Sequence, residues 1–221
     1  MSPFVPPVVA FLAGSIPFGL LVARMKGVDI RRHGSGNIGA TNVLRAVGKP
    51  YGIAVFVLDF LKGLLPVLWA GSALAQHPHA DLVGLGTALA AILGHNYSPW
   101  IGFKGGKGIA TSAGGLVALF PLAVGAAVVF WFVLFKTTRY VSVASMGAAA
   151  AIPAALGCQR LAGFHPPTGA QIAFGLVIAT LAIWRHRSNL RNLAAGKEHR
   201  FGEKKEPGRP ADPPAASPGP S

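Results

Sequence analysis

Long apolar stretches alternate with short polar segments along this chain of 221 residues. A helix needs about 20 mainly apolar residues, within a range of roughly 17–25, to cross a bilayer. Stretches of this kind run over residues 4–23, 51–75, 82–100, 141–157 and 168–184. The pattern therefore predicts a helical protein embedded in a membrane.

One further apolar run, residues 109–135, is longer than a single span and is interrupted by Pro121. Cationic loops stay in the cytoplasm, and two topologies are possible. If the run crosses the membrane once, the 136–140 loop and the basic tail lie outside. If the run goes out and returns near Pro121, every basic loop except the one holding Arg160 lies inside. Residues 109–120 are then too short to span alone and must be sheltered by protein. We expect an all-α integral membrane protein of about seven transmembrane helices, with the N-terminus outside and the C-terminus cytoplasmic.

Composition supports this class and excludes others. Hydrophobic residues make up 52% of the chain and charged residues only 12%, whereas soluble domains carry about 25% charged residues. Lys and Arg number 20 against 7 Asp and Glu, but they lie between apolar runs, as topology determinants do, so no nucleic-acid partner is expected. A single cysteine, Cys158, leaves no disulfide framework and no thiolate metal site.

The ends of the chain complete the predicted organisation. No Lys or Arg precedes the first apolar stretch and no small-residue cleavage site follows it, so we interpret it as an uncleaved span. Residues 1–205 are expected to form one membrane-embedded domain. Residues 206–221 are rich in proline and are expected to form a disordered tail.

The segment "HGSGNIGATNVLR", residues 33–45, contains the spacing G-x-G-x-x-G at Gly34, Gly36 and Gly39. A dinucleotide-binding turn must follow a strand, and an acidic residue lies about 20 positions later. Asp59 has that spacing, but the apolar run around it continues to membrane length, and "VDIRRH" before the glycines is no strand. Dinucleotide binding is therefore not expected.

A second glycine-rich segment, "GFKGGKGIATSAGG" at residues 102–115, also misses a known nucleotide motif. Three residues, not four, separate Gly102 from Gly106, and Gly108 stands where the phosphate-binding loop has Ser or Thr. Like the first segment, however, it places glycines and a cation just before a helix. Backbone amides at such a place bind oxyanions.

Each glycine loop therefore supplies candidate anion ligands. Because the two loops share one face of the membrane, they predict two phosphate-bearing ligands, or one ligand with two phosphates. The alternative is that the lysines set topology and the glycines let helices pack closely. The candidate ligands are Ser35, Gly36, Asn37, Thr41 and Arg45 in the first loop, and Lys104, Gly105, Gly106, Gly108 and Thr111, with Lys107 as a second cation, in the other.

Four polar residues lie within or at the end of apolar spans. Asp59 and Lys62 are three apart on one helical face, so they either neutralise each other or shape the floor of a site. His95 and Asn96 directly precede the second glycine loop, where they polarise a carbonyl or hold a phosphoryl oxygen, or else serve the fold. We assign both as catalytic candidates.

Metal and covalent chemistry have little support in the sequence. His77, His79 and Asp81 lie in one short, isolated loop on the predicted outer side, so no metal site is expected. The chain has no G-x-S-x-G motif, and Cys158 has no polar neighbours in sequence.

The C-terminal polar segments add further candidates. Ser142 lies near the cytoplasmic start of a predicted span, and "RHRSNLRNLAAGKEHR", residues 185–200, follows the last one. Arg187, Asn189, Arg191 and Arg200 are able to reach the membrane surface, although a basic helix attracted to anionic lipid has the same composition.

Taken together, these segments resemble the bacterial PlsY-type acyl-phosphate:glycerol-3-phosphate acyltransferases. The resemblance extends over residues 30 to 200. It implies an integral inner-membrane enzyme whose motifs face the cytoplasm. Such an enzyme moves a fatty acyl group from acyl phosphate to the 1-hydroxyl of glycerol 3-phosphate, giving lysophosphatidic acid and phosphate, without metal or cofactor. The matching pieces are "GSGNIGATNVLR", "LDFLKGLLP", "GHNYSPWIGFKGGKGIAT", "RYVSVAS" and "HRSNLRNLAAGKE".

The resemblance also implies roles for individual residues. The first motif carries a functional serine and arginine onto Ser35 and Arg45, and the second carries phosphate-binding glycines and Lys104. The third carries Asn189 and Glu198, with His186 nearby. Ser188 departs from the family, which often has an acidic residue there, so a role for that carboxylate is in doubt.

The expected mechanism follows from the donor, which is a mixed anhydride with a good leaving group. Arg45, Lys104 and the glycine amides would bind the phosphates, and His95 or Asn96 would stabilise the oxyanion. A substrate phosphate oxygen or His186 would accept the proton. A transporter of phosphorylated metabolites and a non-catalytic lipid-binding protein remain alternatives, although a transporter is expected to show inverted repeats and none is evident.

Overall fold

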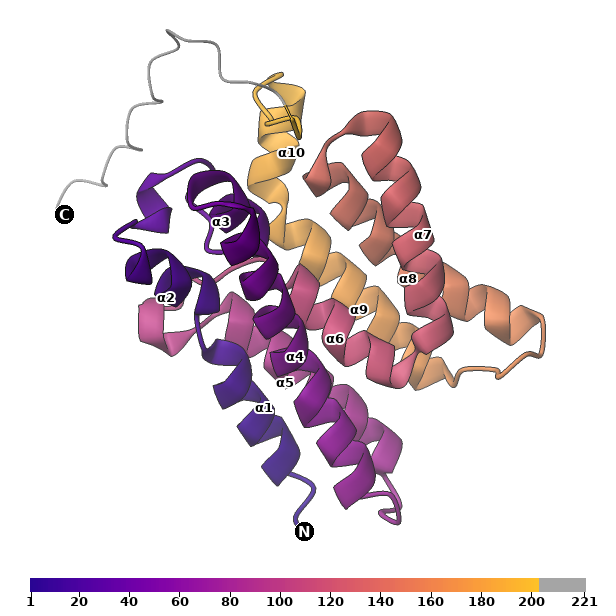
Figure 1. Ribbon diagram of the computed structural model, residues 1–221. Helices are drawn as coiled ribbons and strands as arrows, with labels where there is room; N and C mark the ends of the chain where they lie inside the picture. The colour runs from indigo at the N-terminus through magenta and orange to yellow at the C-terminus, as the bar shows by residue number, and fades with distance from the viewer. Residues whose placement is uncertain (203–221) are drawn as a thin grey trace, which may run out of the picture.

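The computed structural model describes residues 1–202 and shows helices only within that range (Figure 1). The whole of the predicted tail, residues 206–221, lies outside the described residues. The α-helices are α1 (Val5–Ser15), α2 (Phe18–Met25), α3 (Ala40–Ala46), α4 (Lys49–Ala73), α5 (Ala80–Asn96), α6 (Ile109–Leu119), α7 (Pro121–Thr138), α8 (Val141–Leu161), α9 (Gly169–Arg185) and α10 (Arg187–Ala194), with 3-10 turns η1 (Ile30–Arg32) and η2 (Pro99–Ile101).

The helices follow the apolar runs with two adjustments. The first run is divided between α1 and α2, because Pro17 and the extended Ile16 end α1. The run 82–100 ends early, at Asn96, and continues as a polar loop with η2. Pro121 divides the long run into α6 and α7, as predicted.

Several helices have the length and composition of membrane spans. The continuous stretch Val5–Met25 and the helices α4, α7 and α8 are long and apolar enough to cross, and α9 with α10, bent by 53°, makes a fifth candidate. The shorter α6 is apolar but has only 11 residues. The all-α membrane architecture is confirmed at the level of four to five candidate spans plus shorter apolar helices.

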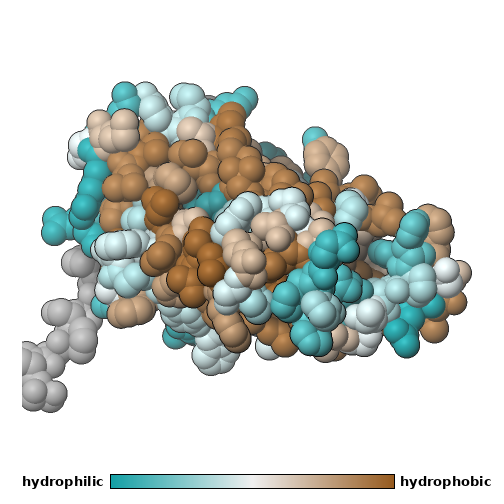
Figure 2. All heavy atoms as spheres, turned by 90° about the horizontal axis from the view of Figure 1, so that it is seen from below, coloured by the Kyte–Doolittle hydropathy of each residue, from teal (hydrophilic) through white to brown (hydrophobic). Residues whose placement is uncertain are grey.

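Large apolar side chains point outward along these helices. Phe4 is 77% exposed, Leu65 55% and Phe132 54%. Seen from the end that holds the N-terminus, hydrophobic residues cover much of the surface, with hydrophilic groups at the left edge and on the right side (Figure 2). An apolar exterior of this extent fits hydrocarbon and not water.

Glycines let two helix pairs approach closely in the interior. A Cβ on Gly14 of α1 would lie 2.2 Å from the carbonyl oxygen of Ala91 in α5. In the other pair, a Cβ on Gly63 of α4 would lie 2.1 Å from the carbonyl oxygen of Thr111 in α6. Contact at this distance is typical of membrane helices, whose association depends on close packing. It also shelters α6, which is too short to face lipid alone.

The polar loops collect at one end of the bundle. In Figure 1, α2, α3, α10 and the α7–α8 loop lie at the top, whereas the N-terminus and the α4–α5 loop lie at the bottom. The candidate site residues belong to the top end.

Candidate active site

The first glycine loop, residues 33–39, is organised by the side chain of Asn42. The Asn42 amide donates to the carbonyl oxygens of His33 (2.9 Å) and Asn37 (2.8 Å), and its oxygen accepts the Ser35 N–H at 3.1 Å. A Cβ on Gly34, where φ is +57°, would lie 2.4 Å from that oxygen. Glycine is therefore required here by the turn itself.

Two further amides of this loop are bonded internally. The Gly36 N–H donates to the His33 carbonyl at 3.0 Å, and the Gly39 N–H donates to the Asn37 side chain at 2.8 Å. These bonds hold the turn closed and occupy the N–H groups of Ser35, Gly36 and Gly39, while anion binding by the loop stays a prediction. The Asn37 side chain takes part in one of these bonds.

Side chains in this region are also available to a ligand. The Ser35 and Arg45 residues are exposed, and Thr41 is half-buried, one turn before Arg45 on the predicted short helix α3. The guanidinium of Arg45 lies near Glu198. Partial burial of the guanidinium lowers the Arg45 pKa, and the negative charge of Glu198 raises it by a smaller amount.

The second glycine loop rests on the C-terminal end of α5. The Gly105 N–H donates to the Asn96 carbonyl (3.2 Å) and the Gly106 N–H to the His95 carbonyl (3.1 Å). A Cβ on Gly106 would lie 2.2 Å from His95 Nε2. These glycines allow close packing on α5, and their N–H groups already have acceptors there; phosphate binding by this loop stays a prediction.

Gly108 and the first turn of α6 differ from the rest of this loop. Gly108 precedes α6 with φ +77°, a conformation that favours glycine. The first amides of a helix have no intrahelical acceptor, and these begin at Ile109. Thr111 is buried in this first turn, with no hydrogen-bond partner for its hydroxyl among the described residues.

His95 and Asn96 lie beneath the loop and not on its outer side. They are 5% and 1% exposed, and His95 Nδ1 lies 3.6 Å from Asp59 Oδ1. Gly106 packs against the His95 ring and Gly108 against the Asn96 side chain, and the oxyanion role of both residues stays a prediction. We infer that they support the loop from the membrane side.

Asp59 and Lys62 form a buried ion pair below His95. Lys62 Nζ lies 2.8 Å from Asp59 Oδ1 and donates to the carbonyl oxygen of Ile16 at 2.7 Å. The two charges thus neutralise each other, which was one of the two alternatives predicted from the sequence. It also caps the end of α1 and supports His95, as a floor for the site would.

A hydrogen-bonded cluster joins the loop to the C-terminal helices. Lys107 donates to the Asn189 side-chain oxygen, and Asn189 Nδ2 donates to Glu198 Oε1 at 2.7 Å. The Ser142 hydroxyl donates to the same Glu198 oxygen at 2.6 Å. The structure therefore brings together Ser142, Asn189 and Glu198, three of the residues that the resemblance or the sequence singled out.

Lys107 is the ammonium group of this cluster. Its pKa is lowered to about 8, chiefly by burial, while the charge of Glu198 raises it and the charges of Arg185 and Arg45 lower it. These influences place Arg45 in the same electrostatic site. Lys104, the predicted cation, is exposed, and its ammonium group makes no hydrogen bond or ion pair with another described residue. The sequence indicated Lys107 only as a second cation beside Lys104, and the contact with Asn189 is what distinguishes the two.

His186 occupies the junction between α9 and α10. It is buried, and its Nδ1 lies 2.8 Å from the carbonyl oxygen of Ala182. A proton on Nδ1 satisfies that contact and leaves Nε2 as the acceptor nitrogen. The arrangement suits the predicted proton acceptor, although that role stays a prediction.

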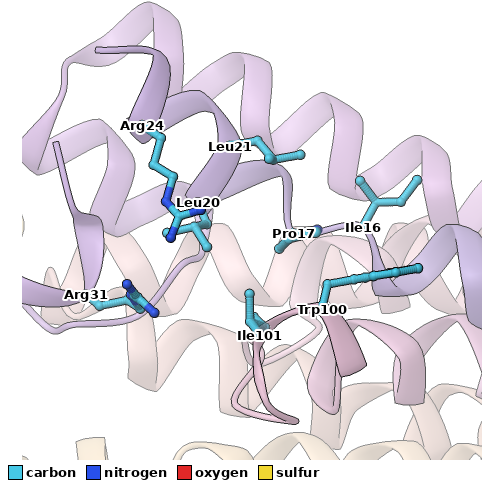
Figure 3. A pocket seen from close by; sticks show the side chains of 8 residues that line it. All are labelled: Ile16, Pro17, Leu20, Leu21, Arg24, Arg31, Trp100 and Ile101. Carbon is cyan, nitrogen blue, oxygen red and sulfur yellow. The ribbon is translucent and has the colours of Figure 1, made fainter. Parts of the chain in front are cut away.

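A hollow of about 380 Å³ opens at the break between α1 and α2 (Figure 3). Arg24 and Arg31 lie toward one end of it and Trp100 toward the other. The Trp100 indole N–H donates to the Ser15 hydroxyl at 2.7 Å. The remaining lining is apolar and consists of Ile16, Pro17, Leu20, Leu21 and Ile101.

Comparison with known proteins decides the family. The family model described as "Glycerol-3-phosphate acyltransferase" matches residues 4–196. The chain belongs to this acyltransferase family. A curated glycerol-3-phosphate acyltransferase of Geobacter sulfurreducens is 46% identical over 193 residues, which cover 87% of this chain and 94% of the relative. One of Aquifex aeolicus is 45% identical over 194 residues, covering 88% and 96%.

Solved structures of PlsY (YgiH), an integral membrane glycerol 3-phosphate acyltransferase, share the fold of this acyltransferase. The glycerol 3-phosphate form superposes with a TM-score of 0.81 at 44% identity, covering 91% of this chain and 96% of that one. The lysophosphatidic acid form gives 0.78 at 42% identity with the same coverage. The acyltransferase is thus an integral membrane enzyme. Within residues 1–202, no group of three His, Cys, Asp or Glu is placed to hold a metal.

Proposed function

We propose that this acyltransferase takes a fatty acyl group from acyl phosphate and transfers it to the 1-hydroxyl of glycerol 3-phosphate. The hydroxyl oxygen forms the new ester bond, the bond from the acyl carbon to the phosphate oxygen breaks, and the products are lysophosphatidic acid and phosphate. The observation that carries the proposal is the cationic cluster of Arg45 and Lys107, held by Asn189 and Glu198 at the polar end of an apolar bundle.

In this proposal the cations bind the substrate phosphates. The Arg45 guanidinium is a planar fork suited to phosphate oxygens, and Lys107 supplies a compact charge beside it. Glu198 accepts hydrogen bonds from both Asn189 and Ser142. It thereby fixes the side chains around Lys107 before substrate arrives. Orientation of this kind is the main requirement, because the donor already has a good leaving group.

Charge and proton transfer then complete the reaction. Negative charge develops on the acyl oxygen and the departing phosphate, where Lys107 and the first amides of α6 provide electrostatic stabilisation. The hydroxyl proton goes to an oxygen of the substrate phosphate or to Nε2 of His186. No covalent enzyme intermediate is needed.

We also propose seven helices crossing or entering the bilayer of a bacterial inner membrane, with the N-terminus outside and the site facing the cytoplasm. The basic segments around α2, α3 and α10 lie at one end of the bundle (Figure 1), and cationic loops stay inside. The domain is taken as residues 1–205. Reporter fusions after residues 46 and 196 are expected to report the cytoplasm, and one after residue 78 the other side; any reversal contradicts this topology.

The donor is tested with the purified protein and three acyl donors. Glycerol 3-phosphate is incubated with acyl phosphate, acyl-CoA or acyl carrier protein, and lysophosphatidic acid is measured by mass spectrometry. Product is expected with acyl phosphate alone. Product from a thioester donor but not from acyl phosphate would refute the proposed donor, and a transporter or a lipid-binding protein would form no product.

The alkaline limb of the pH profile tests Lys107 as a site cation. Because its pKa is lowered to about 8, Lys107 is charged below that pH and neutral above it. We expect kcat/KM for glycerol 3-phosphate, which reports the free enzyme, to fall as pH rises through about 8. Arginine stays protonated up to a pH of about 12, so Lys107→Arg should move the limb upward. An unmoved limb would remove Lys107 from this role.

A further inference from the structure

The backbone of Gly105 and Gly106 is fixed on two sides. Their N–H groups donate to the C-terminal carbonyls of α5, and their carbonyl oxygens accept from the side chain of Arg185. Arg185 Nη2 lies 2.9 Å from the Gly105 oxygen and 2.7 Å from the Gly106 oxygen, and Nε lies 3.1 Å from the latter. Every polar backbone atom of these two glycines therefore has a partner.

The fork of Arg185 is itself held in place. It extends from the last residue of α9, and its guanidinium carbon lies 5.2 Å from the ring centroid of Tyr97, over the ring face. A guanidinium donates to two carbonyls in a fixed plane, which an ammonium group cannot reproduce. Arginine at the end of a membrane helix ordinarily marks topology, whereas these contacts are directed at the protein.

The contacts of Arg185 link the loop to the helix that completes the phosphate site. Lys107 follows Gly106 directly and donates to Asn189 on α10, which begins two residues after Arg185. One short segment thus supplies both the fork that holds the loop and the acceptor for the ammonium of Lys107. If the loop moved away from α9, the contact between Lys107 and Asn189 would break.

We propose that Arg185 is a positioning residue, which holds the Gly105–Gly106 backbone so that Lys107 stays at the phosphate site. It acts through the loop and does not touch substrate. The inference rests on the proposed role of Lys107 in the acyltransferase reaction. The inference gives the end of α9 a positioning function. The sequence there, an arginine beside a histidine, is equally typical of a topology signal.

The test compares Arg185→Ala and Arg185→Lys with Arg187→Ala in the full-length protein. Arg187 is a matched control because it is exposed and its guanidinium bonds to Trp184 and stacks on its ring, with no bond to the glycine loop. Arg185→Ala is expected to lower kcat/KM about 100-fold, the cost of a small misplacement of a reacting group. Arg185→Lys should recover little of this loss, and Arg187→Ala should stay within about threefold of wild type.

Chemical rescue separates positioning from a general loss of structure. Guanidinium chloride, added far below denaturing concentrations, should raise the activity of Arg185→Ala about tenfold and leave Arg187→Ala unchanged. The thermal midpoint of each variant is measured alongside. Wild-type activity on acyl phosphate in the same assay tests the proposed function. An inactive wild type would refute the proposed function, whereas the variants test only the role of Arg185.

Three results would overturn the role of Arg185. One is activity of Arg185→Ala within threefold of wild type, and another is a folded Arg185→Ala variant that guanidinium does not rescue. The third applies if Arg185→Ala does not fold. Full activity of Arg185→Lys would then exclude a requirement for the guanidinium fork.

Discussion

Replacing Lys107 with methionine is expected to lower kcat/KM by about 100- to 1,000-fold, the loss measured when one electrostatic donor is removed from an active site. Methionine keeps much of the length of the side chain but removes the charge that faces Glu198 and Asn189. The loss should appear as a lower kcat as well as a higher KM for glycerol 3-phosphate, because the ammonium is assigned both to the substrate phosphates and to the charge that develops during transfer. Steady-state kinetics with acyl phosphate held at saturation measures both constants.

Lys104→Met is the matched control for this prediction. Lys104 lies on the same loop but is exposed, and exposed charges contribute little to a site they do not contact. We expect its kcat/KM to stay within about threefold of wild type. If Lys104→Met loses more activity than Lys107→Met, the sequence-based choice of cation was right and the assignment made from the structure is wrong.

Asp59→Leu is expected to destabilise the protein by about 3–5 kcal/mol, the cost of leaving a buried charge without its partner. The side chains of Asp59 and Lys62 are only 3% and 4% exposed. Lys62 would keep only the Ile16 carbonyl as acceptor, and His95 would lose its carboxylate neighbour. Thermal unfolding in detergent, compared with wild type at one pH, measures the loss.

The double variant Asp59→Leu/Lys62→Met separates the unpaired charge from the loss of packing. Replacing both members of a buried ion pair with apolar residues is often neutral or stabilising. The double variant should therefore recover most of the lost stability, while activity stays low if His95 no longer supports the glycine loop. A double variant as unstable as Asp59→Leu would mean that packing, and not charge, explains the effect.

The sequence predicted the helices well because span length and proline positions are local properties. The division at Pro121 was predicted, because the run is longer than a single span and proline interrupts it. The break at Pro17 was missed, because the apolar pattern continues through it. The helix end there is stabilised by residues that are remote in sequence. The end of α1 is capped by Lys62 and Ser98, which are remote in sequence.

The site was only partly predictable for a physical reason. Glycine allows both a ligand and another helix to approach the backbone closely, so a glycine-rich loop does not reveal which of the two it serves. Here Gly105 and Gly106 serve α5. The choice between Lys104 and Lys107 depends on the direction of the chain before Gly108 and on the position of α10, neither of which local sequence determines. Arg45 and Asn189 were named from the sequence because their motifs are distinctive, and their roles stay predictions.

The central claim is that the cluster of Arg45, Lys107, Asn189 and Glu198 binds the substrate phosphate. A crystal structure of this protein with glycerol 3-phosphate tests it most directly. The phosphate is expected within about 3 Å of the Lys107 ammonium or the Arg45 guanidinium, the distance of a charge-assisted hydrogen bond. A phosphate bound instead to the backbone of residues 34–39, or beside Lys104, would contradict the account.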